Sequence, residues 1–309
     1  MKEPDDIKTN SAKAWMLAAR PKTLAAAVVP VLVGCALAYY YHAFQWIPAL
    51  ACLFFAMLMQ IAANLINDLF DYLKGCDGED RLGPLRATAQ GWISMPAMKK
   101  GIFLIILFAC LIGSMLIFYG GWEMILVGCF CAAFAYFYTS GPYPLAYNGL
   151  GDVAVIVFFG LVAVGFTCYV QTLCWTKVIV FSGLVTGMVV NTLLVLNNYR
   201  DRDTDRKSGK RTIVVRLGEP FGRYLYLFSG VLAVLIICVV FLFENSAEFT
   251  YRNFCLPFFT PFYLIPHYFT WRKISKIKKG KALNALIGET SRNMLFFAFL
   301  LSSGLIICR

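Results

Sequence analysis

Charged residues are scarce in this chain of 309 residues. Asp, Glu, Lys and Arg together make up 15% of it, whereas they make up about 25% of an ordinary soluble domain. Hydrophobic residues account for 60% of the sequence. Apolar side chains in this excess are better placed against lipid than against water. The composition therefore excludes an ordinary soluble domain and predicts an integral membrane protein.

Histidines and closely paired cysteines are also lacking. His42 and His267 are the only histidines and lie far apart in sequence, which disfavours a haem site or a His-based zinc or iron site. The 11 cysteines form no Cys-x-x-Cys pair, and most lie in or beside apolar segments. We expect them to be packing residues rather than a disulfide framework. Any metal bound by this chain should therefore prefer oxygen ligands.

The N-terminal segment, residues 1–22, is polar and mixed in charge. It lacks the short apolar core and the small-residue cleavage site of a secretory signal. We expect it to be retained as a cytoplasmic tail. Residues 1–309 are predicted to form a single membrane-embedded domain.

Apolar segments of about the length that crosses a bilayer core, roughly 17–25 residues, recur along the whole chain. They cover residues 24–41, 46–66, 102–119, 122–138, 153–170, 178–196, 224–243, 254–269 and 294–307. Helices satisfy their own backbone hydrogen bonds in lipid. The predicted fold class is therefore all-α, a polytopic membrane helix bundle of about nine transmembrane helices, with two Asp-rich cytoplasmic loops.

Basic residues are distributed unequally between the loops. When successive loops are assigned to alternate sides of the membrane, all but Lys177, Arg252 and Arg309 of the 28 Lys and Arg residues fall on the N-terminal side. Positively charged loops face the cytoplasm, so we expect the N-terminus and the long loops to be cytoplasmic, most simply at a bacterial inner membrane. This asymmetry and anionic lipid headgroups account for the net charge of +11, so no nucleic-acid partner is expected.

The first acidic segment, residues 64–80, reads NLINDLFDYLKGCDGED and follows the second apolar segment. If that span remains helical, Asn64, Asp68 and Asp71 are spaced i, i+4, i+7 and share one helix face. Three oxygen ligands would then converge. The role of Asp77, which lies further along, stays open.

The second acidic segment, residues 196–211, reads LNNYRDRDTDRKSGKR and follows the sixth apolar segment. Here Asn197, Asp201 and Asp205 are spaced i, i+4, i+8, so they lie on one side of a helix. Asp203 points elsewhere on the same helix and is the acid we expect not to be a ligand.

Clusters of carboxylates are electrostatically costly, because two unit charges about 4 Å apart repel by roughly 4 kcal/mol at an effective dielectric near 20. A cation between them relieves this repulsion. Oxygen-only ligands select a hard cation, and Mg²⁺ usually takes one or two carboxylates while phosphate and water complete its shell. Two such clusters with basic neighbours therefore suggest a diphosphate bridged by Mg²⁺. The alternative is that both segments are merely solvated loops with salt bridges and no bound metal. The repeated Asn-x-x-x-Asp spacing argues against this alternative.

Both segments resemble the UbiA superfamily of intramembrane aromatic prenyltransferases, which carries two Asp-rich motifs on cytoplasmic loops. The strings Asn-Asp-x-x-Asp-x-x-x-Gly-x-Asp at 67–77, DRLGPLR at 80–86 and Asn-Asn-x-Arg-Asp-x-x-Thr-Asp-x-x-x-Gly-Lys-Arg-Thr at 197–212 look like its 1,4-dihydroxy-2-naphthoate polyprenyltransferase branch. The string ARPKT at 19–23 also looks like the family's entry into its first helix. The resemblance covers nearly the whole chain.

The resemblance implies a Mg²⁺-dependent enzyme that transfers a polyprenyl group from its diphosphate to dihydroxynaphthoate, with decarboxylation, to give a demethylmenaquinol in menaquinone biosynthesis. It implies catalytic roles for Asp68, Asp71, Asp201 and Asp205, which together with Asn64 and Asn197 would hold the metal. Diphosphate-binding roles are implied for the basic residues Lys22, Lys74, Arg86, Arg206 and Lys210. The polyprenyl tail would lie among apolar helices beside membrane lipid. Tyr136, Tyr138, Tyr143 and Tyr147 could face an allylic cation, or could belong to an interfacial aromatic belt.

Two alternatives stay open at this point. The same fold could prenylate another aromatic acceptor such as 4-hydroxybenzoate, although the Gly83-Pro84-Leu85-Arg86 string argues against it. A secondary transporter could also have about nine spans with polar residues among them. Transporters place their acids near the bilayer midplane, whereas here most acids cluster at predicted helix ends, which favours the enzyme.

Overall fold

The computed structural model describes residues 7–75, 81–243, 252–307 and 309. Within these ranges the chain forms helices and no strands. The first half contains α1 (Ala12–Ala19), η1 (Pro21–Thr23), α2 (Ala25–Tyr40), α3 (Trp46–Leu73), α4 (Met95–Met115), α5 (Ile117–Gly120), α6 (Glu123–Phe137) and η2 (Leu145–Tyr147). The second contains α7 (Gly151–Val155), η3 (Ile156–Val162), α8 (Ala163–Thr172), α9 (Lys177–Lys207), α10 (Ile213–Phe243), α11 (Arg252–Phe259), η4 (Thr260–Tyr263), α12 (Leu264–Ile277) and α13 (Leu283–Ile307).

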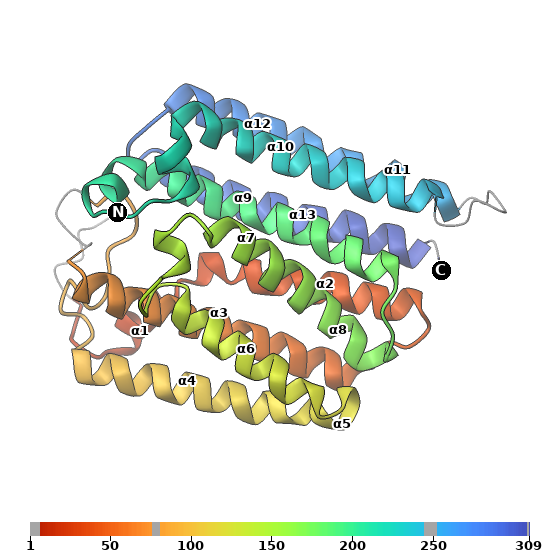
Figure 1. Cartoon of the computed structure of the whole chain (residues 1–309), viewed down its shortest axis with the longest axis horizontal. Helices are drawn as coiled ribbons and strands as arrows, with labels where there is room; N and C mark the ends of the chain where they lie inside the picture. Colours follow the sequence, from red (N-terminus) through yellow and green to blue (C-terminus); the bar gives the residue numbers. More distant parts are fainter. Residues whose placement is uncertain (1–6, 76–80, 244–251, 308) are drawn as a thin grey trace.

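The long helices lie roughly side by side and run back and forth along the molecule (Figure 1). The turns after α3, α9 and α12 lie at the end that also carries α1, whereas the C-terminus lies at the opposite end. We call the first of these the polar end, because the acidic segments and most basic residues belong to it. The bundle thus gathers loops that are far apart in sequence at one end.

The expected membrane spans are confirmed in kind but not in number. Among the described residues, six helices are long and apolar enough to cross a membrane, and a seventh span results if the pair Ala12–Thr23 and Ala25–Tyr40, bent by 51°, counts as one. The apolar helix α6 has only 15 residues. Residues 252–277 are divided into shorter pieces, with Pro257 inside α11 and Pro261 in η4, because proline cannot donate the helical hydrogen bond. The count of about nine is therefore not established.

The segment expected to be an N-terminal tail contains a helix, α1. The Ser11 side chain accepts a hydrogen bond from the backbone N–H of Ala14, 3.3 Å away, which is the usual way to begin a helix. Ala14 and Ala18 are buried in a small core with Leu65 and Leu69 of α3. This contact fixes α1 beside the first acidic segment.

The largest core joins α2, α9, α10 and α13. The π-helix η3 approaches α9 closely, because a Cβ added to Gly187 would lie 2.5 Å from the carbonyl oxygen of Ile156. Only glycine permits such a backbone approach. A smaller core joins α2, α3, α6 and α8 at the opposite end from the acidic segments. Side chains of both cores line the larger of the two cavities described below.

Candidate functional site

Two neighbouring cavities occupy the space between the two halves of the bundle. The polar cavity, about 250 Å³ in volume, is lined by Asp71, Gly75, Arg81, Arg86, Tyr147, Asp201, Thr204, Asp205, Lys207, Ser208 and Lys210. The apolar cavity, about 420 Å³ in volume, is lined mainly by hydrophobic side chains of α2, α3, α4, α6, η3 and α9. Asn67 and Asn197 line the apolar cavity, one helical turn before Asp71 and Asp201 in the polar one. Charged and lipophilic surroundings are therefore about one turn apart.

Both acidic segments begin inside a continuous helix, as their spacing requires. α3 continues to Leu73 and α9 to Lys207, so the helical assumption behind both motifs is confirmed. Asn64, Asp68 and Asp71 are 4%, 1% and 7% exposed, so the shared face points into the protein. Their surroundings nevertheless differ from one another.

Asp68 anchors the loop that follows its own helix. Its Oδ2 accepts a hydrogen bond from the backbone N–H of Ala87, and its Oδ1 accepts one from Thr88, each at 2.9 Å. Asn64 likewise makes structural bonds, since its Nδ2 donates to the Ala19 carbonyl at 2.9 Å and to Thr23 Oγ1 at 3.0 Å. Neither side chain lines the polar cavity.

Asp71 is the residue of the first segment that reaches the polar cavity. Its carboxylate forms an ion pair with Arg86 and accepts a hydrogen bond of 2.8 Å from the Tyr147 hydroxyl. The Tyr147 ring also faces two cations, with Lys74 Nζ 4.2 Å and Lys210 Nζ 5.6 Å from its centroid. Tyr147 was expected either as a cation-facing ring or as part of an interfacial aromatic belt, and its bond to Asp71 depends on a turn that the sequence does not reveal.

In the second segment, Asp201 and Asp205 line the polar cavity. Arg200 donates to the Asp201 carboxylate from Nε at 2.7 Å and from Nη2 at 2.6 Å. Lys210 Nζ lies 3.5 Å from Asp205 Oδ1. Asp203 is exposed and lines neither cavity, in agreement with its expected direction.

The predicted basic residues separate into two groups. Arg86 and Lys210 line the polar cavity. Lys74 lies beside it, over the Tyr147 ring, and donates to the Thr139 carbonyl at 2.6 Å. Lys22 and Arg206 are exposed and line neither cavity. Arg81 and Lys207, two further basic neighbours of the acidic segments, line the polar cavity as well.

Oxygen atoms dominate the potential metal ligands of the polar cavity. In the described part of the chain, no group of three or more His, Cys, Asp or Glu side chains is already arranged around one point. One oxygen is nevertheless left without a partner, because the buried Oδ2 of Asp205 accepts no hydrogen bond. An unpaired buried carboxylate oxygen favours a bound cation, and an all-oxygen set suits a hard divalent ion. Asp77 lies outside the described residues.

A hydrogen-bonded clamp joins the loop of the first segment to the second segment. Arg200 Nη1 donates to Asn284 Oδ1 at 2.8 Å, and Asn284 Nδ2 donates to the Leu82 carbonyl at 2.7 Å. A Cβ added to Gly83 would lie 2.8 Å from Arg200 Nη2. Asn284, on α13, was not expected from the sequence, since no local motif marks it. The clamp fixes the position of Asp201 relative to the loop that carries Arg86.

Comparison with known proteins identifies the family. The UbiA prenyltransferase family model matches residues 27–301. A 1,4-dihydroxy-2-naphthoate octaprenyltransferase from Haemophilus influenzae is 33% identical over 303 residues, which is 96% of each chain. Its counterpart from Mycobacterium tuberculosis is 38% identical over 220 residues, covering 71% of this chain and 74% of the relative.

The fold agrees with this assignment. A UbiA homolog from Archaeoglobus fulgidus bound to GPP and Mg²⁺ superposes with a TM-score of 0.65 at 15% sequence identity, over 94% of this chain and 99% of that structure. The family match covers most of the chain, and the long apolar helices are those of an integral membrane protein. The chain therefore belongs to the UbiA prenyltransferase family and is a membrane enzyme that transfers prenyl groups.

Proposed function

We propose that this enzyme transfers a polyprenyl group from its diphosphate to 1,4-dihydroxy-2-naphthoate, in a Mg²⁺-dependent reaction that releases carbon dioxide and yields a demethylmenaquinol. The observation that carries the proposal is the position of the polar cavity, which contains acids and cations, about one helical turn from a long apolar cavity. A polyprenyl diphosphate has a charged head and a lipophilic tail and matches this pair. The naphthoate acceptor is suggested by the names of the relatives.

The diphosphate would lie in the polar cavity. Arg86 and Lys210 form ion pairs with acids of its wall, Arg81 and Lys207 line it as well, and Lys74 extends this positive surface beside the Tyr147 ring. Guanidinium and ammonium groups bind phosphate oxygens strongly. We assign weaker roles to Lys22 and Arg206, because both are exposed outside the cavity.

Of the six side chains predicted as metal ligands, we propose that Asp71, Asp201 and Asp205 hold Mg²⁺, because they line the polar cavity. Asn64 and Asp68 would hold the surrounding backbone in place through their hydrogen bonds. Asn197 would lie in the wall of the apolar cavity. Bound Mg²⁺ supplies positive charge that stabilises the departing diphosphate. Arg86, Arg200 and Lys210, which pair with these carboxylates, would be available to phosphate oxygens when the carboxylates hold the metal.

The reaction breaks the allylic carbon–oxygen bond, and the bonding electron pair leaves with the diphosphate. The basic residues of the polar cavity stabilise the developing negative charge. The electron-rich ring carbon that bears the carboxylate attacks the allylic carbon and forms the new carbon–carbon bond. Loss of carbon dioxide returns the electron pair of the carbon–carboxylate bond to the ring and restores its aromaticity. Tyr138, which lines the apolar cavity, would face the allylic cation with its ring.

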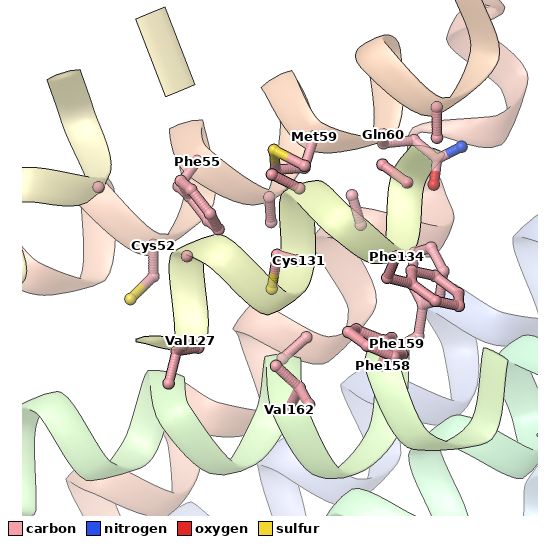
Figure 2. Close-up of a pocket in the computed structure, with 18 of the residues that line it drawn as sticks. Cys52, Phe55, Met59, Gln60, Val127, Cys131, Phe134, Phe158, Phe159 and Val162 are labelled. Carbon is pink, nitrogen blue, oxygen red and sulfur yellow. The ribbon is translucent and has the colours of Figure 1, made fainter. Parts of the chain in front are cut away.

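We further propose that the polar cavity faces the cytoplasm, because the polar end carries nearly all the basic residues. The apolar tail would occupy the cavity of which Figure 2 shows a part, with Phe55 and Met59 of α3 on one side and Phe158 and Val162 of η3 on the other. The hydrophobic side chains of this cavity would surround the tail with an apolar environment similar to that of membrane lipid.

The experiment that tests this function is a product analysis. Purified enzyme in lipid is supplied with Mg²⁺, a polyprenyl diphosphate and either dihydroxynaphthoate or 4-hydroxybenzoate, and the products are identified by mass, with a chelator as the control. A prenylated naphthoquinol lacking the carboxylate, formed only with Mg²⁺, supports the proposal. If prenylated hydroxybenzoate is the preferred product, the proposed acceptor is wrong. If the chelator leaves the activity unchanged, the proposed Mg²⁺ dependence is wrong.

A further inference from the structure

Two buried polar atoms at the wall of the apolar cavity lack hydrogen-bond partners. One is Nη2 of Arg20 and the other is Oε1 of Gln60. Leaving a buried polar group unpaired costs about 1–3 kcal/mol, and more for a charged group. A donor-only cation and a neutral acceptor beside one cavity therefore point to a ligand that carries both an anionic group and a hydroxyl donor.

The chain holds Arg20 in an unusual backbone conformation. Arg20 lies between α1 and η1 with φ of 54° and ψ of 68°, in the left-handed region that residues other than glycine rarely occupy. Thr23 Oγ1 donates to the Arg20 carbonyl at 2.9 Å, and Asn64 Nδ2 donates to the neighbouring Ala19 carbonyl at 2.9 Å. Strained backbone that the surroundings hold in place is typical of functional sites. Here it directs the guanidinium toward the cavity.

The charges around Arg20 favour an additional anion. Arg86 and Arg81 repel its guanidinium, whereas Asp68 and Asp71 attract it. The carboxylates of Asp68 and Asp71 are already engaged, by the backbone of residues 87–88 and by Arg86 with Tyr147. Arg20 thus lacks an ion-pair partner of its own among the described residues.

The orientation of Gln60 is fixed by its neighbour. Because Asn64 donates from Nδ2 to the Ala19 carbonyl, its Oδ1 is left as an acceptor, and Gln60 Nε2 donates to it at 3.3 Å. Gln60 Oε1 is therefore available to the cavity. Figure 2 shows Gln60 on the same cavity as Phe134 and Phe158, whose rings are stacked with centroids 3.7 Å apart. An aromatic ligand would find a ring pair, a cation and a hydrogen-bond acceptor among the residues that line this one cavity.

We propose that Arg20 and Gln60 form the subsite that binds the aromatic acceptor. The Arg20 guanidinium pairs with the ring carboxylate, and Gln60 Oε1 accepts a hydrogen bond from a ring hydroxyl. The inference rests on the proposed function, in which the acceptor is an aromatic hydroxy acid. The competing anion is the diphosphate of the donor. We favour the acceptor, because Arg20 and Gln60 line the apolar cavity while the polar cavity has cations of its own.

The test measures the KM values of acceptor and donor separately in Arg20→Gln, Arg20→Lys and Gln60→Leu, together with equilibrium binding of dihydroxynaphthoate alone. Arg292→Gln is the matched control, because Arg292 is an exposed arginine of α13 outside both cavities. Arg20→Gln should raise the acceptor KM and Kd at least about tenfold, as expected for a lost charge-assisted bond, and the donor KM should change less than about twofold. Arg20→Lys, which keeps the charge, should recover part of the loss.

A second comparison separates this inference from the function on which it rests. The wild-type enzyme and Arg20→Gln are each given dihydroxynaphthoate and 1,4-naphthalenediol, which lacks the carboxylate. The wild type should prefer the acid, and Arg20→Gln should lose most of that preference. If the wild type prenylates dihydroxynaphthoate but the variant keeps both its acceptor KM and its preference, the subsite is refuted while the function stands. A rise in the donor KM alone would assign Arg20 to the diphosphate instead. Should Arg20→Gln fail to fold, Gln60→Leu and Arg20→Lys decide by the same measurements.

Discussion

The acids of the two segments have different roles although their spacing is similar. Asp68 binds backbone N–H groups, whereas Asp71, Asp201 and Asp205 line the polar cavity. The i, i+4 pattern predicts which side of a helix each acid occupies, and the exposed position of Asp203 agrees with that prediction. The pattern cannot predict which acid accepts hydrogen bonds from the backbone of another loop. Asp68 accepts hydrogen bonds from residues about 20 positions later, and that pairing depends on the tertiary path of the loop.

Replacing Asp205 or Asp201 by asparagine should reduce prenyl transfer at least about a hundredfold, since each removes a negative oxygen from the proposed metal site. Asp203→Asn is the matched control, because Asp203 lies on the same helix but is exposed and outside both cavities. The measurement is the initial rate of product formation at saturating Mg²⁺. A loss in Asp203→Asn equal to that in Asp201→Asn would show that cavity lining does not identify the ligands.

Asp68→Asn should lower stability as well as activity. The amide group of asparagine retains one acceptor oxygen, so one of the two buried N–H groups of residues 87 and 88 loses its partner at a cost of about 1–3 kcal/mol. The midpoint of thermal unfolding in detergent should therefore fall in Asp68→Asn and stay near the wild-type value in Asp203→Asn, because Asp203 is exposed. Equal midpoints for the two variants would contradict the anchoring role of Asp68.

At the scale of the helix, the sequence predicts what depends on local pattern and misses what depends on contact between helices. The continuation of α3 and α9 through their acidic segments follows from the spacing of their polar residues. The π-helix η3 and the helix α1 do not, because η3 is tied to the close approach of α9 and α1 is buried against α3. Asn284 was missed for the same reason, since its partners Arg200 and Leu82 lie in other segments.

Gly187→Ala should destabilise the protein, because the new Cβ would lie 2.5 Å from the backbone oxygen of Ile156 and would force η3 away from α9. Gly288→Ala is the matched control within a helix. A Cβ at Gly288 meets nothing within 4 Å, and alanine is favoured over glycine in a helix by about 1 kcal/mol. Thermal unfolding should move in opposite directions for the two variants. A rise in the midpoint for Gly187→Ala would mean that η3 and α9 are less tightly apposed.

At the scale of the whole molecule, the distribution of charge carries the most functional information. Composition alone predicts a membrane helix bundle, and the unequal loops predict that the active end is the basic one. The number of spans could not be predicted as securely, because bends and prolines divide apolar stretches into pieces that sequence alone does not distinguish from complete helices. The meeting of both acidic segments at one end depends only on helix order, which is why the sequence anticipates it.

The orientation of the molecule gives the final prediction. Lys177 begins α9 at the end opposite the polar cavity, and Lys281 precedes α13 at the polar end, and both are exposed. In intact bacterial cells, a membrane-impermeant maleimide should label Lys177→Cys above the wild-type background, and should label Lys281→Cys only after the cells are permeabilised, because basic loops remain in the cytoplasm. Labelling of Lys281→Cys from outside would invert the bundle. The polar cavity would then open away from the compartment in which soluble anionic acceptors are made, and the proposed orientation would have to be abandoned even if the chemistry were retained.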